Sequence, residues 1–130
     1  MKTELMYLVW VTTLTAVLWI PYILDRIMVG GIMDAVGYPA SPKPQSPWAQ
    51  RMKAAHANAV ENLVVFAALV LATQDAGVSN TATILACMIY FWARVVHLLA
   101  YTAAMPWVRT LAFAAGFFCQ LTLAWQLLAR

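Results

Sequence analysis

Charged side chains are scarce in this chain of 130 residues, since Asp, Glu, Lys and Arg make up only 10% of it. A soluble globular domain usually carries about 25%, so the composition excludes an ordinary water-soluble fold. Hydrophobic residues account for 64%. The basic excess is small, eight Lys and Arg against five Asp and Glu, and anionic lipid headgroups explain it better than nucleic acid does. We therefore predict an integral membrane protein that contacts the lipid bilayer and no nucleic acid.

Cysteine is also scarce, and the two residues, Cys87 and Cys119, both lie inside apolar runs. Buried apolar thiols are usually inert, so we predict neither a disulfide framework nor a metal site. The sequence lacks a Ser/His/Asp arrangement and a glycine-rich phosphate loop as well. Chemistry would therefore be brought by a cosubstrate, with the protein supplying position and positive charge.

Four apolar segments are long enough to cross a bilayer, because about 20 helical residues span a hydrocarbon core roughly 30 Å thick. They predict an all-α protein with helices at about 5–25, 47–74, 79–104 and 106–129. The one long connection, at about 29–46, is rich in proline and glycine, which break regular structure, and we expect one helical turn at 32–36. Residues 1–130 thus form a single membrane domain, a four-helix bundle.

Basic residues predict the orientation of this bundle. They gather in the first and third connections and their flanks, as Arg26, Lys43, Arg51, Lys53 and Arg109, whereas the opposite side has only Lys2 and Arg130. Because basic loops stay in the cytoplasm, we place these two connections there and both termini outside.

Polar residues form one stripe on each of the two middle helices. At about 100° per residue, an arc of roughly 100° on the second helix holds Arg51, Asn58, Glu61 and Asn62. An arc of roughly 60° on the third helix holds Tyr90, Arg94, His97 and Tyr101. An unpaired charge at mid-bilayer costs about 2.5–3.5 kcal/mol or more, so both stripes must face other helices or a polar cavity. Matching depth predicts a buried ion pair between Glu61 and Arg94.

A purely structural role explains these residues equally well, because polar side chains often join membrane helices by hydrogen bonds. We assign such a role to His56, which lies off the stripe. Gly116 and its alanine neighbours predict a close helix contact. If the stripes instead form a binding site, its cations and amides suit a small polyanionic molecule, and an apolar substrate could reach it from the bilayer.

Three segments carry a resemblance to a known family. Residues 55–62, AHANAVEN, followed by Phe66, resemble the second-helix signature of the MAPEG superfamily, the membrane-associated proteins of eicosanoid and glutathione metabolism. Residues 93–101, ARVVHLLAY, resemble its third-helix signature, and residues 106–110, PWVRT, resemble the start of its fourth helix. The compact size and the proline-rich loop look like the bacterial branch, whose members lie in the inner membrane.

This resemblance implies a homotrimer with glutathione bound between neighbouring subunits at the cytoplasmic side. It implies that Asn58 and Glu61 bind the glutathione backbone, that Arg94 and Tyr101 complete the pocket, and that Arg26 clamps a glutathione carboxylate. Arg109 would hold the thiol as thiolate, with Thr110 nearby. We add Arg51 and His97 to the expected binding residues.

The leading hypothesis is a glutathione-dependent membrane transferase or peroxidase that acts on lipophilic electrophiles or hydroperoxides. A second is a non-catalytic trimer of the same superfamily that binds a lipid or a membrane partner. A third is a small proton-coupled exporter that uses Glu61.

Overall fold

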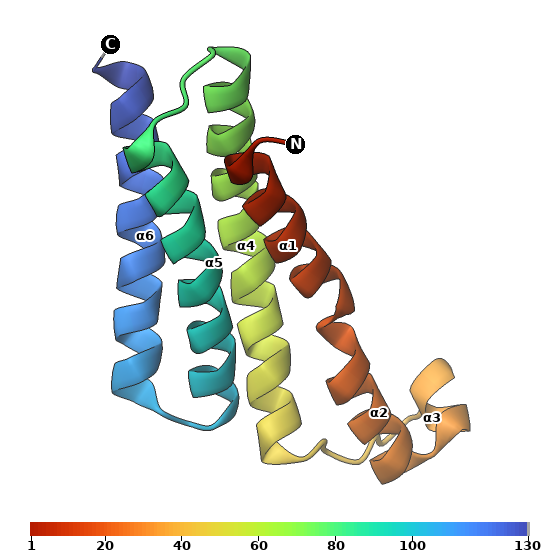
Figure 1. Ribbon diagram of the computed structural model, residues 1–130. Helices are drawn as coiled ribbons and strands as arrows, with labels where there is room; N and C mark the ends of the chain where they lie inside the picture. Colours follow the sequence, from red (N-terminus) through yellow and green to blue (C-terminus); the bar gives the residue numbers. More distant parts are fainter. Residues whose placement is uncertain (130) are drawn as a thin grey trace.

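The computed structural model describes residues 1–129. Arg130, one of the basic residues used to predict the orientation of the bundle, lies outside the described residues. Within that range every regular element is a helix. The helices are α1 (Thr3–Val17), α2 (Trp19–Gly30), α3 (Ile32–Val36), α4 (Pro47–Asp75), α5 (Thr81–Thr102) and α6 (Pro106–Leu128) (Figure 1). Four segments are long and apolar enough to cross a membrane: Thr3–Gly30, which joins α1 and α2, and the helices α4, α5 and α6. The predicted all-α membrane protein with four spans is confirmed.

The first span differs from the expected helix at 5–25. It is broken at Leu18, because Pro21 has no N–H to donate to the carbonyl of Val17, the residue at which α1 ends. It also begins earlier, since Glu4 is buried and accepts hydrogen bonds from the hydroxyls of Ser79 (2.7 Å) and Thr83 (2.9 Å).

The span also ends later than predicted, at Gly30, because the charged Asp25 does not face water. Asp25 is buried and accepts hydrogen bonds from the backbone N–H of Ser46 (3.0 Å) and from its hydroxyl (2.5 Å). The hydroxyl of Tyr22 lies 2.8 Å from His56 Nδ1. These contacts fasten α2 to the start of α4 and support the structural role predicted for His56.

The other three predicted helices match α4, α5 and α6 to within two residues at each end, α5 being shorter than predicted at both ends. The expected helical turn at 32–36 forms as α3, and the segment at 37–46 is not helical. Ser46 stands at the N-cap position of α4 without a side-chain capping bond, since its hydroxyl donates to Asp25. Pro47 occupies the first turn, where the missing N–H has no helical partner to lose.

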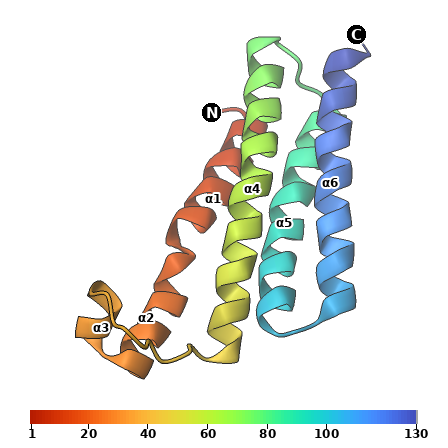
Figure 2. The same cartoon turned by 180° about the vertical axis from the view of Figure 1, so that it is seen from behind.

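The helices α4, α5 and α6 run side by side, and α1 leans against α4 and α5 (Figures 1 and 2). The helix α2 diverges from α5 and α6 toward α3. The start of α1 and the end of α6 lie at one end of the bundle, and the proline-rich segment and the α5–α6 turn lie at the other (Figure 1).

The core is centred on α5. Tyr90 stacks on Phe66 of α4, with ring centroids 3.8 Å apart and planes 8° from parallel. Gly116 of α6 faces the same ring, and a Cβ atom there would lie 3.6 Å from two atoms of Tyr90. The predicted close contact at Gly116 is confirmed, and it lets the middle of α6 approach the middle of α5.

A tight turn joins α5 to α6. The N–H of Met105 donates to the carbonyl of Ala100 (2.8 Å), and the N–H of Ala104 donates to that of Tyr101 (3.2 Å). Ala104 has φ 60°, a left-handed conformation that glycine adopts more easily. With Pro106 starting the next helix, the turn places Arg109 one helical turn into α6, beside Tyr101.

Candidate functional site

A buried guanidinium organises the polar cluster between α4, α5 and α6. Arg94 is 4% exposed and donates from Nη2 to Asn58 Oδ1 (2.7 Å), with His97 Nδ1 at 3.3 Å. The amide of Asn62 donates to the carbonyl of Asn58 (2.9 Å) and to Asn58 Oδ1 (3.2 Å). Gln120 of α6 donates to the carbonyl of Asn62 (3.3 Å). The two predicted stripes therefore meet.

The expected ion pair between Glu61 and Arg94 is wrong for the single chain. Arg94 is bonded to Asn58 and His97, and Glu61 is exposed. At about 100° per residue, Glu61 lies roughly 60° from Asn58 on the side away from Asn62. That rotation turns its carboxylate out of the contact between α4 and α5.

A polar cavity of about 310 Å³ opens beside the cluster, lined by Asn58, His97, Tyr101, Arg109, Thr110 and Phe113. The guanidinium carbon of Arg109 lies 4.9 Å from the centroid of the Tyr101 ring, a cation–π distance. The hydroxyl of Thr110 donates to the carbonyl of Pro106 (2.8 Å). No carboxylate lines this cavity among residues 1–129.

A second hollow of about 240 Å³ shares Tyr101 and Arg109 with the cavity and adds Arg51. Arg51 donates from Nε to the carbonyl of Thr102 (2.9 Å). This carbonyl belongs to the last turn of α5, where a cation interacts favourably with the helix dipole. Arg51 therefore holds the end of α5 against α4.

The structure thus gathers seven of the nine predicted site residues, namely Arg51, Asn58, Arg94, His97, Tyr101, Arg109 and Thr110. Arg26 and Glu61 line neither hollow. Sequence reasoning missed Gln120, which is 7% exposed. An amide in the middle of an apolar span was the signal that could have found it.

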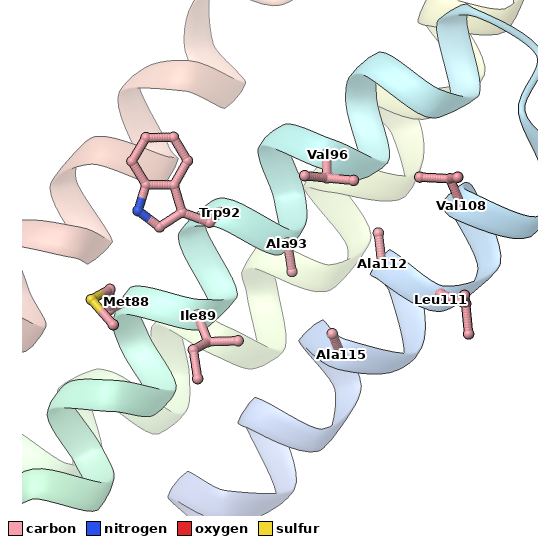
Figure 3. Close-up of a pocket in the computed structure, with 9 residues that line it drawn as sticks. All are labelled: Met88, Ile89, Trp92, Ala93, Val96, Val108, Leu111, Ala112 and Ala115. Carbon is pink, nitrogen blue, oxygen red and sulfur yellow. The ribbon is translucent and has the colours of Figure 1, made fainter.

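An apolar groove of about 430 Å³ lies between α5 and α6 and shares no lining residue with the polar cavity. The small side chains of Ala93, Ala112 and Ala115 lie between the two helices, with Trp92 and Met88 at one side (Figure 3). Its nine residues carry no ionisable group, so the groove offers contact to apolar molecules and nothing that could activate a thiol.

The four spans and the buried polar cluster define an integral membrane protein with an open cavity that holds Arg109 beside the polar cluster. A family model described as the MAPEG family matches residues 8–129, nearly the whole chain, and the chain therefore belongs to the MAPEG family. The predicted membership is confirmed, and it points to a membrane function related to glutathione or eicosanoids. Comparison with curated proteins and with solved structures gave no match.

Proposed function

We propose that this protein is a glutathione-dependent membrane transferase or peroxidase that activates the glutathione thiol against lipophilic electrophiles or hydroperoxides. One observation carries the proposal: the cavity holds the Arg109 guanidinium and polar groups, and within residues 1–129 no carboxylate neutralises it. Such a cavity suits a ligand that brings its own negative charges. Glutathione has two carboxylates and a thiol that can ionise.

Asn58, His97 and Tyr101 would hold the peptide, and Arg109 would face the sulfur. A free thiol titrates near pH 8.5 or so, and only the thiolate is a strong nucleophile. A guanidinium at close range lowers such a pKa by about one to three units. At neutral pH the thiolate fraction would then rise from a few per cent to roughly a quarter or more.

The thiolate would form a C–S bond with the electrophile, whose leaving group departs with the bonding electron pair. With a hydroperoxide, two thiols would give one disulfide, an alcohol and water. The lipophilic substrate would reach the sulfur from the bilayer, because Thr110 and Phe113 of the cavity wall are exposed on a membrane-spanning helix.

We further propose that the chain assembles as a homotrimer in a bacterial inner membrane, with both termini outside. Glu61 is exposed inside a membrane span, and an uncovered charge there costs about 2.5–3.5 kcal/mol. A neighbouring subunit would cover Glu61, and the Glu61 and Arg26 side chains that the single chain leaves outside the cavity would complete glutathione sites between subunits.

The test is an ultraviolet difference spectrum for thiolate, recorded when glutathione is added to the detergent-solubilised protein. We expect a thiolate signal at neutral pH that Arg109→Ala abolishes while glutathione binding, measured by calorimetry, weakens far less. Lys53→Ala is the matched control, because Lys53 is an exposed cation on α4 that lines neither hollow. It should keep the signal.

Other outcomes would identify the alternatives. Glutathione binding without a thiolate signal would support a non-catalytic MAPEG protein that binds a lipid or a membrane partner. Absence of binding, together with pH-dependent cation binding that requires Glu61, would support an exporter.

A further inference from the structure

Arg94 lines neither polar hollow, yet it touches two residues that line the larger one. A guanidinium has five N–H donors and no acceptor. Each atom that bonds to it must therefore be an acceptor, which fixes how Asn58 and His97 are turned.

Asn58 presents its oxygen to the interior. Oδ1 accepts from Arg94 Nη2 (2.7 Å) and from Asn62 Nδ2 (3.2 Å). The amide nitrogen of Asn58 is then on the other side, and within residues 1–129 it makes no hydrogen bond. Since Asn58 lines the cavity, its two N–H groups are available there.

His97 is fixed in the same way. Its Nδ1 lies 3.3 Å from Arg94 Nη2 and must accept. A neutral imidazole with an accepting Nδ1 carries its proton on Nε2. His97 also lines the cavity, and in the described chain no side chain or carbonyl accepts from its Nε2.

We propose that Arg94 is a positioning residue that turns Asn58 and His97 into hydrogen-bond donors toward the cavity, so that this wall selects the acceptor-rich, carboxylate-bearing part of its ligand. Arg94 acts through its two neighbours and does not touch the ligand. The identity of that ligand as glutathione rests on the proposed function. The donor character of the wall does not, since it follows from the contacts of Arg94.

The first test reads the tautomer directly. In the ligand-free protein with ¹⁵N-labelled histidine, at alkaline pH, we expect the chemical shifts of His97 to report Nε2–H and an unprotonated Nδ1. His56→Gln leaves one histidine and assigns the signals. Arg94→Met should weaken the preference and give a mixture of tautomers with a measurable Nδ1–H fraction. A proton on Nδ1 in the unmutated protein, or an unchanged tautomer in Arg94→Met, would overturn the proposal.

A second test does not need the Arg94 variant to fold. In His97→Gln the amide nitrogen reaches the place of Nε2 and can still donate to the cavity, whereas in His97→Asn it reaches only the place of Nδ1. We expect His97→Gln to keep the glutathione Kd within about threefold and His97→Asn to weaken it about tenfold or more. Equal losses in both variants would contradict the proposal.

The two proposals fail separately. If the unmutated protein does not bind glutathione, the proposed function fails. The tautomer of His97 still decides whether Arg94 turns Asn58 and His97 into hydrogen-bond donors toward the cavity.

Discussion

Replacing Asn58 with aspartate would separate the stability of the polar cluster from its ability to bind an anion. The new carboxylate keeps the oxygen that accepts from Arg94, where Nη2 and Oδ1 are 2.7 Å apart. It also converts a neutral acceptor into a charged partner for a guanidinium that is 4% exposed. On the cavity side, however, the variant replaces an N–H₂ donor with a second carboxylate oxygen.

The effect of Asn58→Asp on stability and its effect on anion binding have opposite signs. At an effective dielectric constant of about 20, charges 4 Å apart interact with about 4 kcal/mol. The attraction between the introduced carboxylate and Arg94 offsets the cost of desolvating that carboxylate, so the folded state should be at least as stable as the original. The same carboxylate repels a ligand carboxylate in the cavity by about 3 kcal/mol, roughly 100-fold in Kd.

Calorimetric titration with glutathione and thermal unfolding in detergent measure these two quantities on the same sample. Asn58→Leu is the control, because it removes the acceptor and leaves the buried guanidinium without a partner on α4. It should lower both stability and affinity. If Asn58→Asp binds glutathione as tightly as the unmutated protein, the cavity wall does not act as an anion site.

Three further pairs of variants test the packing that positions the site, each by thermal unfolding in detergent. Ala104→Gly should stabilise the folded protein by about 0.5–1 kcal/mol. Removing the left-handed strain of alanine gains about 1–2 kcal/mol, and the larger entropy of glycine in the unfolded chain offsets part of that gain. Gly77→Ala should lower stability, because Gly77 has φ 70° and the open space around its Cβ position leaves only the backbone strain to act. Gly116→Leu should cost about 1–3 kcal/mol by overpacking the facing tyrosine ring, while Gly116→Ala, whose Cβ fits at 3.6 Å, should not. A Gly116→Leu variant as stable as Gly116→Ala would show that the contact is not tight. Asp25→Ala should cost about 2 kcal/mol through its lost charge-assisted hydrogen bonds. A loss no larger than that of Asp34→Ala, at an exposed position, would show that the Asp25–Ser46 contact does not hold α2 to the start of α4.

The sequence by itself determined the fold class and most helix boundaries. A long apolar run has few alternatives to a membrane helix, because every backbone polar group must be satisfied inside the bilayer. Prolines and glycines then marked where helices begin and end, as at Ser46 and Pro47, where α4 begins. The helical wheel also grouped Asn58 with Asn62, and Arg94 with His97, correctly, since residues three or four apart share a face.

Only the tertiary structure decided which polar groups are partners. Depth and charge favoured Glu61 as the partner of Arg94. A rotation of about 60° around α4, however, separates Asn58, which lies in the contact between the helices, from Glu61, which lies outside it. The guanidinium of Arg94 therefore bonds to Asn58. Gln120 joined the cluster because Gly116 lets α6 approach Tyr90 closely. Asp25 was buried because Ser46, 21 residues away, offers two donors at one point. Such pairings depend on the rotation and separation of packed helices, which no single helix encodes.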